Sequence, residues 1–94
     1  MKAKRVERTV SYREDLDAIE AHIAIDSPRA ALEMWLLIDE QVDQLADPNF
    51  PRRKGRVSGT LELVAHQNYI VILVEDATTI TALNVVHARQ RWPK

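Results

Sequence analysis

The sequence predicts an α+β fold in which a helical hairpin lies on one face of a mostly antiparallel four-stranded sheet, in the order β-α-α-β-β-β. Helical periodicity fills residues 11–45, extended alternation fills residues 60–87, and a proline-containing break separates the two. The chain has 94 residues, 46% of them hydrophobic, which is enough for one small core. We therefore expect a single domain over residues 1–94.

A short strand and a helix are expected first. Residues Val6 to Val10 alternate loosely, as in a strand. Ser11 is followed three residues later by Glu14, which is a capping-box pattern and predicts a helix from Ser11 to about Asp26. Its apolar stripe is Tyr12, Leu16, Ile19 and Ile23.

A second helix follows after almost no loop. Ser27 can cap it, and Pro28 is tolerated at its first position, where an amide hydrogen is not needed. The short connection predicts an antiparallel hairpin. Its apolar stripe is Ala31, Met34, Trp35, Ile38, Val42 and Leu45. Three leucines lie off this stripe and need a sheet or a partner to cover them: Leu32, Leu36 and Leu37.

The second half of the chain reads as strands. Pro48 and Pro51 end the helix, and a basic loop extends from Arg52 to Arg56. From residue 60 to residue 66 one face carries Leu61, Leu63 and Ala65, and the other carries Thr60, Glu62, Val64 and His66. A tight turn at residues 67–68, a strand over 69–74, a turn over 75–78 and a strand over 79–87 complete the sheet.

Composition excludes several kinds of protein. The chain has no cysteine, so it has no disulfide, thiolate zinc site or cysteine nucleophile, and a reducing cytoplasm is the expected location. The longest apolar run, Tyr69 to Val74, is too short to cross a bilayer, and we expect no membrane partner. The net charge is only −1, but acids dominate residues 14–47 and bases dominate residues 52–56 and the last six residues.

Two basic segments are the candidate functional residues. The loop residues Arg52, Arg53, Lys54 and Arg56 suit phosphate contacts, although a solvated surface loop explains them equally well. The last eight residues, where the last strand ends, contain His87, Arg89, Arg91 and Trp92. An arginine there can stabilise charge on a phosphate, whereas Trp92 can simply cover the core and His87 can be a satisfied strand histidine.

Other chemistry finds little support in the sequence. His22 and His66 lack a second ligand at metal-binding spacing, so no metal site is expected. The chain has only two glycines, Gly55 and Gly59, and no phosphate-binding glycine loop. We expect no cofactor.

Several segments resemble the ParE/RelE superfamily of toxins from type II toxin–antitoxin systems, nearer its ParE branch. The two most specific are the Gly-Arg-Val-x-Gly-Thr-x-Glu-Leu-Val stretch at residues 55–64 and the His-Ala-Arg-Gln-x-Trp-Pro stretch at residues 87–93. The resemblance extends from Val6 to Pro93. It implies growth arrest, a role such as plasmid stabilisation, and a cognate antitoxin whose C-terminal segment wraps the toxin. On that analogy, Leu32, Leu36 and Leu37 are candidate antitoxin-binding residues.

The superfamily implies two activities, and a third interpretation stays open. A ParE-like member poisons DNA gyrase and is not an enzyme, with target-binding residues Arg52, Arg53, Lys54, Arg56, Arg89, Arg91 and Trp92. A RelE-like member cleaves mRNA on the ribosome, and the catalytic set would be Lys54, Arg56, His87 and Arg89. Family members commonly carry arginine where this chain has Leu61, which disfavours the nuclease and leaves an attenuated toxin that only binds antitoxin as the third interpretation.

Overall fold

The computed structural model describes residues 3–93, and within them the chain forms five strands and two helices. In chain order these are β1 (Arg5–Arg8), α1 (Val10–Ala24), α2 (Pro28–Gln44), β2 (Arg53–Lys54), β3 (Leu61–His66), β4 (Tyr69–Glu75) and β5 (Thr79–His87). The predicted α+β class and the order of the predicted elements are confirmed. The predicted strand count is wrong by one, because the basic loop contributes the short strand β2.

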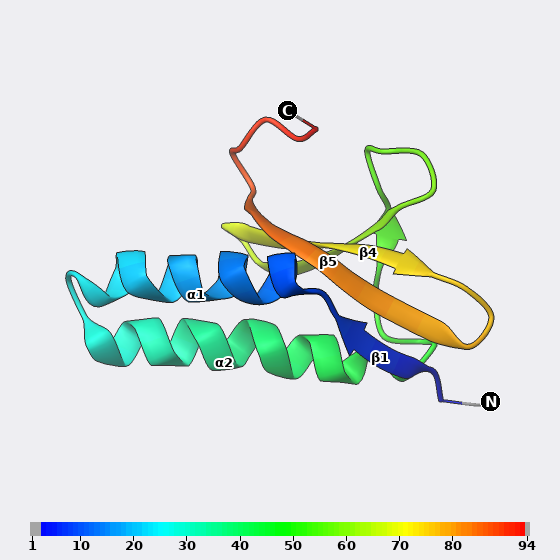
Figure 1. The fold of residues 1–94 in the computed structure, drawn as a ribbon, viewed down its shortest axis with the longest axis horizontal. Coiled ribbons are helices and arrows are strands. Elements are labelled where there is room, and N and C mark those ends of the chain that lie inside the picture. The colour runs from blue at the N-terminus through cyan, green and yellow to red at the C-terminus, as the bar shows by residue number, and fades with distance from the viewer. Residues whose placement is uncertain (1–2, 94) are drawn as a thin grey trace.

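The strands form one mixed sheet in the order β1-β5-β4-β3-β2. β1 pairs with β5 in parallel, and the other three pairings are antiparallel. The hairpin of α1 and α2 lies on one side of this sheet, and its far end extends beyond the sheet (Figure 1). The last strand has the predicted bounds, whereas the first strand ends at Arg8 because Val10 already belongs to α1.

The N-cap of the first helix lies two residues before the serine that the capping box indicates. Its N-cap is Thr9, whose side-chain oxygen accepts a hydrogen bond from the amide of Tyr12 at 3.0 Å. The Thr9 hydroxyl also donates to the carbonyl of Leu83 at 2.6 Å, and its amide donates to the carbonyl of Ala82 at 3.0 Å. Contacts with β5 therefore select Thr9 as the cap, and Ser11 lies inside the helix.

The second helix follows the sequence prediction. Ser27 accepts a hydrogen bond from the amide of Ala30 at 3.1 Å, and Pro28 occupies the first turn. Tyr12 of α1 is fully buried and donates its hydroxyl to Asp39 of α2 at 2.9 Å. Arg8 of β1 donates to the same Asp39 oxygen at 2.8 Å. This network joins the first strand to both helices.

Replacing Tyr12 with phenylalanine is expected to lower the free energy of unfolding at neutral pH by ~1–2 kcal/mol, because a buried hydrogen bond to a carboxylate is lost. Burial, and then the bond to Asp39, raises the pKa of Tyr12 above its ordinary value of 10.0. Tyr12 therefore stabilises the fold below pH 10, and its contribution falls as the pH rises further, since the unfolded chain ionises first. Denaturant unfolding from pH 7 to 11 should show this loss in the native protein and a smaller one in Tyr12→Phe.

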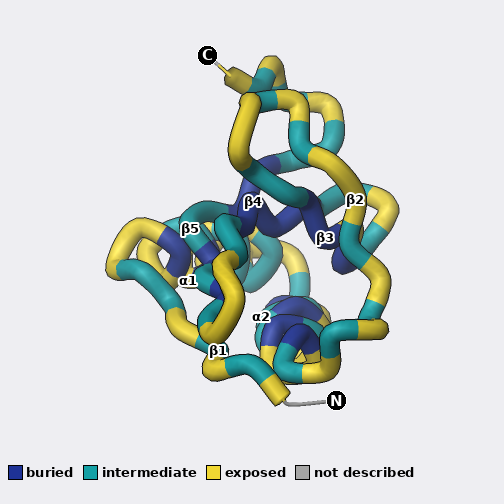
Figure 2. The backbone as a smooth tube through the Cα atoms, turned by 90° about the vertical axis from the view of Figure 1, so that its right-hand side faces the viewer, coloured by how far each residue is buried: buried dark blue, intermediate teal, exposed yellow. Residues whose placement is uncertain are grey.

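Apolar residues pack on both faces of the sheet. The main core lies between the sheet and the hairpin and includes Tyr12, Leu16, Ile38, Val42, Leu45, Leu63, Val71, Leu73 and Ile80. A smaller cluster, Ile70, Ile72 and Val86, lies on the other face, where Trp92 packs against it. The buried residues lie along β3, β4 and one side of α2, whereas the loops are largely exposed (Figure 2). No helix in the described part of the chain is long and apolar enough to cross a membrane.

Candidate target surface

The basic loop contains β2 and leads into a closed turn before β3. Arg53 is paired with Glu62 and Lys54 with Leu61, and the amide of Gly55 donates to the carbonyl of Thr60 at 2.9 Å. A side chain at Gly55 would meet the Thr60 hydroxyl oxygen at 2.2 Å, and Gly59 has a φ of +84°. Both glycines are therefore required by the turn.

Glu62 is the buried acid at the base of this loop. Sequence alternation predicts an outward-facing position, but the residue is only 2% exposed. One carboxylate oxygen accepts from Nε and Nη2 of Arg53 at 3.1 and 3.0 Å, and the other accepts from the amide of Arg56 at 3.1 Å. On the face of β3 opposite the hairpin the loop covers Glu62, which the alternation pattern does not reveal.

The Arg52 side chain is largely buried. Its guanidinium donates to Glu75 at 3.0 Å and to the carbonyls of Phe50 and Asp47. Lys4 pairs with the same Glu75 carboxylate at 2.8 Å. The structure thus places Arg52 at the base of the segment after α2, and its charge is already paired.

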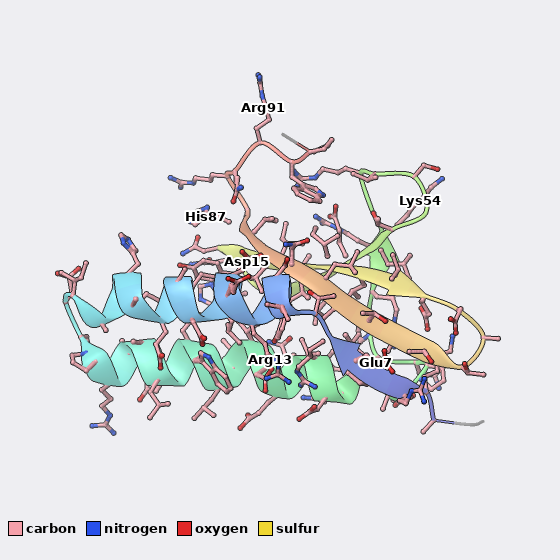
Figure 3. The ribbon with its side chains drawn as sticks, in the orientation of Figure 1. Glu7, Arg13, Asp15, Lys54, His87 and Arg91 are labelled. Carbon is pink, nitrogen blue, oxygen red and sulfur yellow. The ribbon has the colours of Figure 1, made fainter. Side chains whose placement is uncertain are left out.

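The remaining cations of the two basic segments are exposed. Lys54, Arg56, Arg89 and Arg91 are all exposed, and so is Arg53 despite its bond to Glu62. Figure 3 shows Lys54 on the loop and Arg91 pointing away from the sheet. We call Arg53, Lys54, Arg56, Arg89 and Arg91 the cationic surface.

Both halves of the cationic surface lie on the same side of the sheet. The loop and the C-terminal segment are on the side away from the hairpin (Figure 1). Glu62, which holds the loop, is the cross-strand partner of Ile72, and Ile72 belongs to the small cluster under Trp92. The indole nitrogen of Trp92 is buried without a hydrogen-bond partner among the described residues. Trp92 therefore anchors the segment that carries Arg89 and Arg91.

His87 faces the opposite direction. It lines a groove of about 300 Å³ together with Asp15 and His22 of α1, and Figure 3 shows it above that helix. Its Nδ1 accepts from the amide of Arg89 at 3.1 Å, and its ring lies edge-on to Tyr69 at 5.5 Å. The structure consequently separates His87 from Lys54 and Arg56, the loop residues of the nuclease set.

Two acidic residues of α1 accept hydrogen bonds from other elements of the fold. Asp15 accepts from the side chain of Asn84 and the amide of Val85 at 3.1 and 3.0 Å. Asp17 accepts from the indole of Trp35 at 3.2 Å. Within residues 3–93, no group of three or more His, Cys, Asp or Glu side chains is arranged to hold a metal ion.

The three leucines of α2 that lie off its stripe are 53%, 40% and 41% exposed at Leu32, Leu36 and Leu37. They do not form one straight strip, because Leu36 and Leu37 are about 100° apart around the helix. Leu37 is on the same side as Gln41, whose amide nitrogen donates to the carbonyl of Ala65 in β3 at 2.6 Å.

A groove beside this helix was not foreseen from the sequence. Its volume is about 410 Å³, and it is lined by Gln41, Phe50, Pro51, Arg52, Arg53, Glu62, Leu63 and Val64. In the described part of the chain, β2 covers the outer edge of β3 only at Leu61 and Glu62. The edge from Leu63 to His66 has no partner strand there, and Val64 is exposed beside it.

Leu61 occupies a position at which arginine is common in the superfamily that this sequence resembles. Its side chain packs against the main core on the hairpin side of the sheet. Glu62 faces the other side, toward the loop. Leucine at this position therefore adds to the core between the sheet and the hairpin, on the side away from the cationic surface.

Residues 6–92 match the family model described as the ParE toxin of the type II toxin–antitoxin system parDE. The chain is 35% identical over 94 residues to the Sinorhizobium fredii protein named "Putative toxin Y4kP", covering all of this chain and 98% of that one. Among solved structures, it is similar to a chain of the chromosomal ParDE system of Pseudomonas aeruginosa, with a TM-score of 0.79, 24% identity and coverage of 90% and 96%. A chain of the RelBE2 toxin–antitoxin complex of Mycobacterium tuberculosis has a TM-score of 0.62, 21% identity and coverage of 96% and 97%.

Proposed function

Because this chain belongs to the ParE toxin family of type II toxin–antitoxin systems, we propose that it arrests growth by binding and poisoning DNA gyrase. The cationic surface is the part of the molecule that contacts gyrase or the DNA held by it. A cognate antitoxin neutralises the protein by covering α2 and the open edge of β3.

The observation that carries this proposal is the gathering of exposed cations from two distant chain segments on one side of the sheet. The chain as a whole has a net charge of −1, so this side differs in charge from the acidic hairpin. Such a local field favours an acidic or phosphate-bearing partner and speeds its association. Arg52 is left out of the surface, since its guanidinium is bound to Glu75.

The position of His87 favours a binding poison over the RelE-like ribonuclease. A nuclease built from Lys54, Arg56, His87 and Arg89 needs an acid–base group close to the cations that hold the phosphate. His87 instead lines the groove beside α1, and its Nδ1 already accepts a backbone amide. Both tyrosines lie outside the C-terminal segment, so no phenol accompanies Arg89 and Arg91 there.

A supercoiling assay tests the gyrase proposal. Purified protein would be added to gyrase, ATP and relaxed plasmid, and both supercoiled product and trapped cleavage complexes would be scored. We expect loss of supercoiling and linearised plasmid, both reversed by the cognate antitoxin. Unchanged supercoiling at high excess would overturn the proposal, and new 5′ ends on translated messages would then establish RNA cleavage.

The antitoxin part of the proposal rests on the surface around α2. Three exposed leucines lie on α2, and Leu37 is one turn from Gln41, which lines the groove of about 410 Å³ beside the open edge of β3. A partner segment can bury the leucines with an amphipathic helix and add a strand to β3. Leu36 and Leu37 point about 100° apart, so a segment that contacts both must cover a broad face of α2.

A further inference from the structure

Glu62 is the single buried acidic side chain in the described part of the chain. Withdrawing a carboxylate from water is costly unless hydrogen bonds and opposite charges compensate. Glu62 receives both, from the guanidinium of Arg53 and from the amide of Arg56. The carboxylate is therefore kept buried by the basic loop, and the loop is in turn restrained by the carboxylate.

The contacts of Glu62 lie on both sides of Lys54. One oxygen holds Arg53, which precedes Lys54, and the other holds the amide of Arg56, which follows Gly55. The side-chain Nε of Arg56 is also 3.8 Å from that second oxygen. One carboxylate thus bridges the two ends of the segment that presents Lys54.

The other hydrogen bonds of the turn join residues within the turn. The Gly55–Thr60 backbone bond and the bond of the Thr60 hydroxyl to Val57 close the turn on itself. Both bonds lie within residues 55–60. Besides the two-residue pairing of β2 with β3 and the bond of Arg52 to Glu75 of β4, the side-chain contacts that tie residues 52–56 to the sheet are those of Glu62.

Glu75 provides an internal comparison. It also holds two cations, Lys4 and Arg52, but both of these are largely buried and lie outside the cationic surface. The partners of Glu62 have side chains that are 55% and 43% exposed, at Arg53 and Arg56. Glu62 therefore restrains side chains that a partner can reach, whereas Glu75 restrains the interior.

We infer that Glu62 is a positioning residue for target binding: its buried carboxylate sets the conformation in which the loop presents Lys54, Arg53 and Arg56. The inference rests on the proposed function, because it requires that the cationic surface contacts the target. Glu62 itself makes no contact with that target.

The test compares Glu62→Gln with the matched control Glu75→Gln. Glutamine keeps the size of the side chain but replaces one acceptor oxygen with an amino group that repels the arginine donors. In Glu62→Gln we expect growth inhibition on expression to weaken by about 10- to 100-fold, as for a displaced binding group. Hydrogen exchange of the Arg56 amide should be faster than in the native protein, and antitoxin affinity should be unchanged. Glu75→Gln should retain growth inhibition and Arg56 protection.

Two results would overturn the inference. One is full growth inhibition by Glu62→Gln despite fast exchange at Arg56, and the other is an equal loss of inhibition in Glu75→Gln. If Glu62→Gln does not fold, Glu62→Met fills the buried site with an apolar side chain, keeps every residue of the cationic surface, and should show the same loss, since the 55% exposed Arg53 side chain stays hydrated. Growth arrest and amide exchange do not depend on the identity of the target, so native protein that leaves gyrase unaffected refutes the proposed function alone.

Discussion

Replacing Lys54, Arg89 and Arg91 together with alanine is expected to reduce growth inhibition and gyrase inhibition by roughly 100-fold. All three side chains are exposed, and none has an ion pair among the described residues. Their removal should leave the melting temperature nearly unchanged, since surface cations contribute little to stability. Viable counts after induction and the concentration that halves supercoiling would measure the loss.

The matched control removes the same charge from the other side of the molecule. Arg5, Arg13 and Arg29 are exposed and lie on β1 and the hairpin, and the two ion pairs among them are on the surface. Alanine at these three positions should leave inhibition within about twofold of the native level, because such pairs are weak. If both triple variants weaken inhibition equally, net charge is responsible and the cationic surface has no special role.

The order of elements could be predicted because each depends on neighbours in sequence. Ser27 and Pro28 start α2 through contacts with the next few amides, and the tight turn before Tyr69 needs only local backbone geometry. The start of α1 depends instead on β5, whose carbonyls hold Thr9. A local capping pattern contains no information about that contact, so the prediction of Ser11 as the N-cap is wrong.

The candidate site was predicted less completely for a related reason. A run of arginine and lysine indicates a basic loop, but it does not say which charges the fold has already paired. Glu75 binds Arg52 from 23 residues away, and Glu62 binds Arg53 from nine residues away. Alternation in β3 predicted one buried face, whereas the loop also buries Glu62 on the other face, where Val64 stays exposed. The Gly-Arg-Val-x-Gly-Thr-x-Glu motif did contain the signal, since its glycines, Thr60 and Glu62 all build the turn.

Replacing Leu36 and Leu37 with glutamate is expected to weaken antitoxin binding by roughly 100-fold or more, which would be the largest effect on neutralisation. The two leucines are exposed in the free protein, so charged side chains remain hydrated there and growth inhibition should persist. In the complex they would be buried without a partner, and this difference between the two states weakens binding. Titration calorimetry with the cognate antitoxin, and rescue of growth by its co-expression, would measure the loss.

The control for this prediction is a pair of more exposed apolar residues elsewhere on the hairpin. Val10 and Ile25 are 73% and 80% exposed and lie at opposite ends of α1, Ile25 at its C-cap. Glutamate at both positions adds the same charge and should leave antitoxin affinity within about threefold, as is usual for residues outside an interface. If the antitoxin neutralises the Leu36 and Leu37 variant as well as this control, its binding surface lies elsewhere.

An antitoxin that crosses α2 toward β3 should lose further affinity when Val64→Glu is added, because Val64 is exposed beside the open edge of that strand.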